Sequence, residues 1–243
     1  MSPLLRAELL KLRTTRTFAA LVGAALVLSL LVVGLTAALV SDLSESDVRD
    51  LFSADFSSLF ILLLGVMGMA GEWRHRTITG TVLAAPDRLR LLAAKTLAYA
   101  AAGAVLSLVV TLSIMAVGTL VLSLRGEETA GVVDLADVLW RNLAVAGFLG
   151  ALGVCIGGLV RNQVAAIVGL LVFAFALEPA VLAVAGDVGR FGPTAGAPNG
   201  ILGADSFGDG DLLAPGIAAL VMLGWVGVAF AAAYALLRRR DLV

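Results

Sequence analysis

The stretch FAALVGAALVLSLLVVGLTAALV, residues 18–40, contains 23 residues without a charged side chain. A helix that crosses about 30 Å of hydrocarbon needs roughly 20 apolar residues. Because lipid offers no partner to the backbone, such a stretch must satisfy its own hydrogen bonds as a helix. Five further stretches are almost as free of charge, namely 56–71, 96–124, 142–160, 162–186 and 212–237, and Glu178 is the one charged residue in them. The shortest of the six is 56–71. The sequence therefore predicts an all-α membrane protein with six transmembrane helices.

Charge divides the segments between these stretches into two classes. The basic class holds 13 of the 17 Lys and Arg residues and consists of the N-terminus, residues 72–95, Arg161 and the C-terminus. The other segments carry 13 of the 18 acidic residues. Basic residues near span ends mark the cytoplasmic side, so we expect both termini in the cytoplasm. Residues 18–40 exceed the core of a signal peptide and end without a small-residue cleavage site, which favours a retained first span.

Composition leaves little room for a soluble domain or for catalytic chemistry. With 60% hydrophobic residues and loops of about 25 residues at most, residues 1–243 are expected to form a single membrane domain. One His and one Cys do not make a metal-ligand cluster. The single cysteine, Cys155, lies inside the fourth stretch and excludes an internal disulfide.

Two enzyme motifs are incomplete in this sequence, because each lacks a required residue. A Walker loop needs a lysine after glycine, but Lys11 follows Leu10 and Lys95 follows Ala94. Residues 208–211 spell the Gly-Asp-Gly-Asp of intramembrane aspartyl proteases, whose second aspartate follows a tyrosine; Tyr99 and Tyr234 are both followed by alanine. We therefore expect neither an enzyme nor a cofactor bound by this chain, and no nucleic-acid partner.

Residues 1–17 combine leucines at helical spacing with charged residues between them. Leu5, Leu9 and Leu12 would form the apolar face, and the charged remainder is Arg6, Glu8, Lys11, Arg13 and Arg16. This pattern predicts an amphipathic helix in the cytoplasmic interface. A basic flank that only obeys the orientation rule is the alternative.

The segment 72–95 is the only sizeable inner loop. Trp73 suits the headgroup level. A short apolar face follows Arg74 and Arg76 and consists of Thr77, Ile78, Thr81, Val82 and Leu83. Because Pro86 cannot continue a helix, one or two helical turns should end near Ala85. Two interpretations stay open: a short helix that receives a protein partner, and a solvated basic loop.

These residues resemble a known family. The run Thr77, Ile78, Leu83, Pro86, Arg88, Leu91, Leu92 and Lys95 is similar to the loop between the second and third spans of ABC-2 type permeases, the membrane subunits of ATP-driven exporters. The segment from Glu8 to Arg16 resembles their interfacial connecting helix, and Arg238 to Leu242 resembles their C-terminus. Arg76 departs from the pattern, because many relatives have glycine before the threonine.

The resemblance implies a function as well as a fold. Two six-helix subunits, identical or different, would enclose a pathway in the bacterial cytoplasmic membrane. Separate ATP-binding subunits would hold ATP and Mg²⁺ and dock on this chain's inner loop. The residues expected at that contact are Arg74, Arg76, Thr77, Ile78, Val82, Leu83, Pro86 and Arg88. Efflux of a hydrophobic or amphipathic compound such as a drug, an antibiotic or a lipid is the implied activity.

The outer loop 187–211 contains 14 uncharged residues, 191–204, rich in glycine and proline. Their length and composition suit a re-entrant or interfacial segment, which the resemblance also implies. A flexible glycine-rich loop is the alternative.

Inside the stretches, few residues suggest a pathway. Glu178, followed by Pro179, is either a hinge or polar feature of the exit path or a hydrated carboxylate near the outer surface. Trp225 lies near the middle of the last stretch and either contacts substrate or packs in the core. Gly153 and Gly157, and likewise Gly103 with Ser107 and Thr111, let helices approach closely, and packing within one chain is the preferred interpretation.

Two other functions remain open. An ion-coupled secondary carrier would favour several ionisable residues within the membrane, and the stretches offer only Glu178. A membrane protein that does not transport and confers self-immunity is the other alternative. Nothing in the sequence selects the transported compound.

Overall fold

The computed structural model describes residues 2–40, 44–75, 77–84, 87–126, 134–160, 162–203 and 212–239, and the regular structure in these ranges is helical. Six helical segments are long and apolar enough to cross a membrane: Arg16–Leu39, Ser46–Arg74, Arg88–Leu124, Leu135–Leu159, Gln163–Val184 and Pro215–Arg239. The prediction of an all-α protein with six candidate membrane spans is confirmed.

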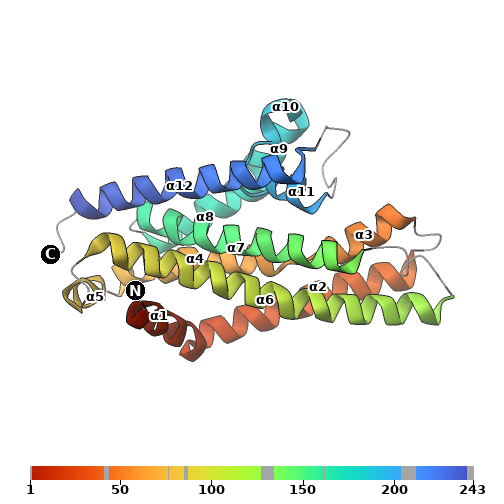
Figure 1. Ribbon diagram of the computed structural model, residues 1–243, viewed down its shortest axis with the longest axis horizontal. Helices are drawn as coiled ribbons and strands as arrows, with labels where there is room; N and C mark the ends of the chain where they lie inside the picture. Colours follow the sequence, from red (N-terminus) through yellow and green to blue (C-terminus); the bar gives the residue numbers. More distant parts are fainter. Residues whose placement is uncertain are drawn as a thin grey trace.

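The helices of the N-terminal half are α1 (Ser2–Thr14), α2 (Arg16–Leu39), α3 (Glu45–Ser53), α4 (Ser57–Arg74), α5 (Ile78–Ala84) and α6 (Arg88–Leu124). Those of the C-terminal half are α7 (Leu135–Leu159), α8 (Gln163–Val172), the π-helix η2 (Phe173–Leu177), α9 (Glu178–Val184), α10 (Gly186–Gly189), α11 (Gly196–Leu202) and α12 (Pro215–Arg239). The N-terminus, α5 and the C-terminal end of α12 lie at one end of the bundle, called the basic end below, and α3 lies toward the other (Figure 1).

The second candidate span is longer than the predicted stretch 56–71. It consists of α3 and α4, with a break at residues 54–56, and therefore includes Asp55 and Glu72, which flank that stretch. Polar side chains bind backbone N–H groups near the starts of both helices: Ser44 caps α3 by accepting from the N–H of Asp47, and Asp55 accepts from the N–H of Ser57. Hydropathy alone does not detect polar residues that are satisfied in this way.

The centre of the bundle depends on backbone-to-backbone approach at glycines. A Cβ atom added to Gly153 of α7 would lie 2.2 Å from the carbonyl oxygen of Leu62 in α4. On the other side, a Cβ added to Gly103 of α6 would lie 2.4 Å from the carbonyl oxygen of Ala146. The predicted small-residue faces thus pack against helices of the same chain, as the preferred interpretation held.

The fifth candidate span changes helix type in its C-terminal half. The backbone N–H of Glu178 donates to the carbonyl of Phe173, five residues earlier, which defines the π-helical turn η2. Pro179 follows and has no N–H of its own to donate. A wide turn at this point therefore coincides with the residue where the regular α-helical ladder loses a donor.

Glu178 is not a hydrated surface carboxylate, and that interpretation is wrong. Its side chain is buried and accepts hydrogen bonds from the backbone N–H groups of Thr194 (2.9 Å), Ala195 (2.8 Å) and Gly196 (2.9 Å), and from the Thr194 hydroxyl. Gly192 packs so closely that a Cβ there would meet the carboxylate. Glu178 therefore holds the outer element, α10 and α11, against the bundle.

The segment predicted at 191–204 is folded as far as the structure describes it. Residues 196–202 form α11, whose Ala197 and Ile201 are buried against α7 and α12. The indole N–H of Trp225 donates to the carbonyl of Phe191 at 2.8 Å, so Trp225 supports this element. Residues 204–211, including the Gly-Asp-Gly-Asp sequence, lie outside the described residues.

Candidate functional site

The candidate site lies at the basic end and is built around the turn from α4 through α5 to α6. After α4 ends at Arg74, the backbone N–H of Thr77 donates to the carbonyl of Glu72 at 3.0 Å. The hydroxyl of Thr81 then donates to the carbonyl of Thr77 at 3.1 Å. Asp87 caps the next helix by accepting from the N–H groups at positions 89 and 90. The predicted short helix exists and runs over Ile78–Ala84.

The structure places the predicted partner-contact residues unequally. Leu83 is 80% exposed, and Arg74 and Thr77 are also exposed. The backbones of Ile78 and Val82 belong to α5. Arg76 and Pro86, like Ala85, Arg161 and the C-terminal 240–243, lie outside the described residues.

Arg88 has partners within the chain. Its guanidinium donates to the carbonyl oxygens of Leu237 (2.5 Å) and Arg238 (3.1 Å) at the C-terminal end of α12. The last carbonyls of a helix lack intrahelical partners, and a cation there also complements the helix dipole. Arg88 thus connects the start of α6 to the last helix.

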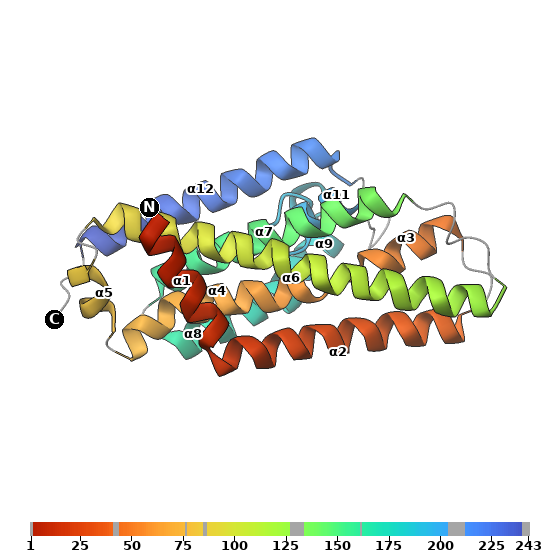
Figure 2. The ribbon, with the colours of Figure 1, turned by 60° about the horizontal axis from the view of Figure 1, so that its bottom comes forward.

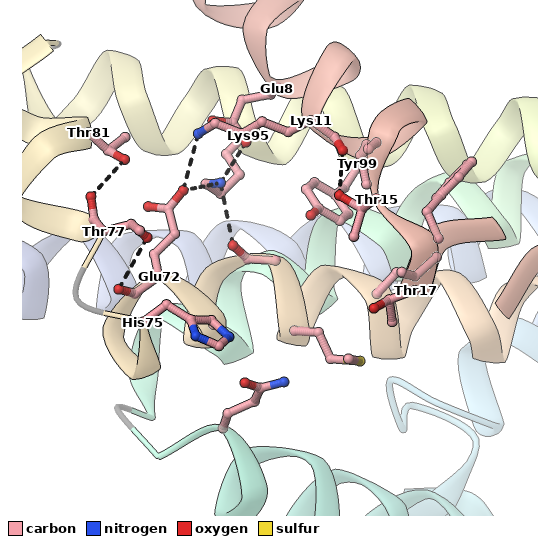
Figure 3. Close-up of a pocket in the computed structure, with 17 residues that line it drawn as sticks. Glu8, Lys11, Thr15, Thr17, Glu72, His75, Thr77, Thr81, Lys95 and Tyr99 are labelled. Atoms are coloured by element: carbon pink, nitrogen blue, oxygen red, sulfur yellow. Dashed lines mark hydrogen bonds and ion pairs between the residues drawn. The ribbon is translucent and has the colours of Figure 1, made fainter. Parts of the chain in front are cut away.

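Four charged side chains from three helices meet close to Thr77 and Thr81 (Figure 3). We call them the charge cluster; its members are Glu8, Lys11, Glu72 and Lys95. Lys95 of α6 donates to Glu8 of α1 at 2.6 Å and to Glu72 of α4 at 2.9 Å. Lys11 lies nearer the surface, 2.7 Å from Glu8 and 3.4 Å from Glu72. Figure 2 shows α1 crossing α6 obliquely, which brings Glu8 over Lys95.

Burial makes this cluster a strong constraint on the fold. Lys95 is 1% exposed, and Glu8 and Glu72 are also buried. Two carboxylates and two ammonium groups give the cluster no net charge, so each buried charge has an opposite partner. Because removal of one partner leaves an uncompensated buried charge, such a break costs about 3–5 kcal/mol.

The predicted interfacial helix is therefore more than an apolar face on a membrane surface. Leu12 is buried as expected, but Leu9 is 37% exposed, and the charged residue Glu8 is the one that points inward. Glu8 belongs to the charged remainder between the predicted apolar positions, yet its side chain is buried. The helix turns inward at Glu8 because Lys95 offers it an ammonium group inside the bundle.

The cluster also sets the ionisation of Glu8. Burial by itself would raise the pKa of this carboxyl group, but the attraction of Lys95 and the hydrogen bonds from Lys11 and Lys95 outweigh it and hold the pKa below the usual value of 4.5. Glu8 is therefore a carboxylate at neutral pH.

A cavity of about 490 Å³ adjoins the charge cluster. The polar side chains that line it include His75, Thr77, Thr81, Tyr99 and Gln163 (Figure 3). Within the described part of the chain, two buried acceptor atoms here, Oε2 of Glu72 and Oε1 of Gln163, have no hydrogen-bond partner. No group of three potential metal ligands occurs among those residues. The geometry suits mechanical connection of the helices and the binding of a polar group.

Sequence reasoning missed Glu8, Glu72 and Lys95 as site residues. Two signals were available: only two lysines occur against 15 arginines, and Glu72 lies one residue beyond an apolar stretch. Neither signal identifies which charges meet, because the three residues come together only where α1 and α4 both pack against α6.

The chain matches no model of a known protein family, and a search of the curated proteins also gives no match. The geometry of the basic end is therefore the evidence on which a function must rest.

Proposed function

We propose that this chain is the permease subunit of an ATP-binding-cassette exporter. In this proposal a separate ATPase docks on α5 and drives a hydrophobic or amphipathic compound out across the bacterial cytoplasmic membrane. The observation that carries it is a short, exposed helix at the basic end that is joined through buried charges to the crossing helices.

The exposed apolar side chain of α5 supports a docking role. Leu83 is 80% exposed on a seven-residue helix, and Arg74 at the end of α4 is exposed as well. A partner surface that covered Leu83 would remove its apolar surface from water, and the basic residues of this end would orient an acidic partner.

The connections of α5 supply a route for movement. Thr77 connects α5 to Glu72 of α4, and Glu72 shares Lys95 of α6 with Glu8 of α1, which leads into α2. A displacement of α5 would therefore be transmitted to α2, α4 and α6, which belong to three of the six candidate spans. Coupling to ATP requires that docking differ in strength between two arrangements of these helices.

The test uses the chain copurified with the ATPase that binds it, reconstituted in nanodiscs. Leu83→Asp should reduce the ATPase activity of the assembled complex to that of the ATPase alone. The matched control is Leu124→Asp, which changes a leucine of equal exposure at the far end of α6. The proposal fails if Leu83→Asp retains full coupling, or if no Walker-type ATPase binds the chain.

A specific observation keeps the ion-coupled carrier as a second candidate. Asp55, Glu72 and Lys95 all lie within candidate spans. The candidate spans therefore contain more ionisable residues than Glu178, the one charged residue in the predicted stretches. A carrier would lose transport when a protonophore collapses the ion gradient. An exporter would lose it when the catalytic lysine of the partner ATPase is changed, and a self-immunity protein would show no transport in either experiment.

A further inference from the structure

Asp55 is a buried carboxylate for which the described residues provide no basic partner. It is 9% exposed and lies at the break between α3 and α4. The ion pairs in the described part of the chain involve other carboxylates. The contrast with the charge cluster, where each buried carboxylate has a lysine, distinguishes this position.

Hydroxyl groups hold the side chain in place. Oδ2 of Asp55 accepts from the hydroxyls of Ser57 (2.8 Å), Ser107 (2.5 Å) and Thr111 (3.1 Å). Among the described residues, Oδ1 accepts only the backbone N–H of Ser57, at 2.8 Å. Since each carboxylate oxygen offers two lone pairs, Oδ1 keeps capacity for another donor.

A second buried acceptor in the same network also lacks a donor. Asn142 is 2% exposed, and its amide nitrogen donates to the carbonyl of Phe52 (3.1 Å) and to the Thr111 hydroxyl (3.1 Å). The Phe52 carbonyl can only accept, which fixes the orientation of the amide. Oδ1 of Asn142 then has no partner among the described residues. The network therefore has more acceptors than donors.

Asp55 also lines a cavity of about 260 Å³ that extends toward the outer element. Much of its wall is apolar and includes Leu59, Leu62, Leu149, Ala174 and Phe175, while Thr194 and Asn199 line its other side. A buried carboxyl group that has no basic partner among the described residues and lies beside an apolar wall suits a ligand that is cationic at one end and apolar at the other.

We propose that this cavity binds an organic monovalent cation, with its ammonium group on Asp55 and its apolar body against α7 and η2. A bare metal ion would need several oxygen ligands around it, which the apolar wall does not supply. The identification of the cation as exported cargo rests on the proposed function, whereas its binding does not.

The experiment measures binding to the purified full chain in nanodiscs, without an ATPase, by ligand-observed ¹⁹F NMR. The probes are 4-fluorophenethylamine, protonated at pH 7, and the uncharged 4-fluorophenethyl alcohol. We expect the amine to bind at least about tenfold more tightly than the alcohol. Asp55→Asn, which keeps the shape and the helix cap, should remove that difference and leave the weak binding of the alcohol unchanged.

Two further variants keep the result interpretable. Asp47→Asn removes an exposed carboxylate of α3 and should leave amine binding intact. Ala174→Phe fills the cavity away from the carboxylate and should abolish amine binding, which tests the site even if Asp55→Asn fails to fold. Equal binding of amine and alcohol, amine binding that survives both Asp55→Asn and Ala174→Phe, or displacement of the amine by millimolar sodium would overturn the proposal. Amine binding without ATP-driven amine export would count against the proposed function alone.

Discussion

At the scale of single residues, Lys95 is the side chain on which the basic end depends. Its ammonium group is within hydrogen-bond distance of Glu8 and Glu72, and it also lies 3.5 Å from the carbonyl of Gly68. A lysine this deeply buried is tolerated only when its charge is compensated. An apolar residue at position 95 would destabilise the fold, because the carboxylates of Glu8 and Glu72 would remain buried without this ammonium group.

Lys95→Met should therefore destabilise the folded chain by about 3–5 kcal/mol, since Glu8 and Glu72 would keep buried negative charge beside the remaining Lys11. Chemical unfolding in mixed micelles, followed by tryptophan fluorescence, measures the change. Adding Glu8→Gln to Lys95→Met should recover part of the loss, which a double-mutant cycle quantifies.

The matched control is Lys11→Met. The side chain of Lys11 is 52% exposed, so water can solvate the charges it leaves, and the loss should stay below about 1 kcal/mol. Equal effects of the two lysine substitutions would contradict the distinct role of Lys95.

The pKa of Glu8 predicts how stability changes with pH. Its folded-state pKa lies below the usual 4.5, so the unfolded state binds the proton more readily and stability is lost as pH falls. The contribution of Glu8 is fully present above about pH 4.5 and disappears as pH drops through the folded-state pKa. The stability difference between wild type and Glu8→Gln should thus be constant from pH 7 to 5.5 and shrink below about pH 4.5. A difference that grows on acidification would show the opposite sign of shift.

At the scale of elements, the glycines of α7 determine how closely the helices pack. Gly153→Ala would bring a methyl group to 2.2 Å from the Leu62 carbonyl, which is backbone and moves only if α4 moves. We expect a loss of about 1–3 kcal/mol. Gly224→Ala in α12 meets nothing within 4 Å and should be neutral or slightly stabilising. The same unfolding measurement compares the two, and a harmless Gly153→Ala would contradict the close packing of α4 on α7.

The elements also show where sequence reasoning succeeds and where it stops. Apolar stretches predicted six candidate membrane spans because hydrophobic length is a local property, and local spacing predicted the short helix α5. The same reasoning ended the second stretch between Asp55 and Glu72 and left both charged residues outside it. Their tolerance depends on partners from α1 and α6, which are distant in the sequence.

Glu178 illustrates the same limit. Its position close to the end of a stretch suggested hydration, but three backbone N–H groups from residues 194–196 supply the hydrogen bonds instead. No spacing rule links position 178 to this loop. The outer element and the buried carboxylate are therefore one structural unit that only the folded chain reveals.

At the scale of the whole molecule, basic segments that are far apart in the sequence gather at one end. The N-terminal helix, α5 and the end of α12 lie together there (Figure 1), and Arg88 binds the last carbonyls of α12. Gathering of the basic segments at one end is what the distribution of charge predicted. If the rule for basic residues applies, this end faces the cytoplasm and α10, after the fifth crossing, faces outward.

Labelling of single cysteines tests that orientation. Gly80 in α5 and Gly186 in α10 both have open space where a side chain would begin, so Gly80→Cys and Gly186→Cys should fold normally. The native Cys155 is fully buried and gives little background. In right-side-out vesicles, a membrane-impermeant maleimide should label Gly186→Cys at least about tenfold faster than Gly80→Cys, and in inverted vesicles the order should reverse. Labelling of Gly80→Cys from outside would place α5 on the side opposite to a cytoplasmic ATPase and would contradict the proposed exporter function.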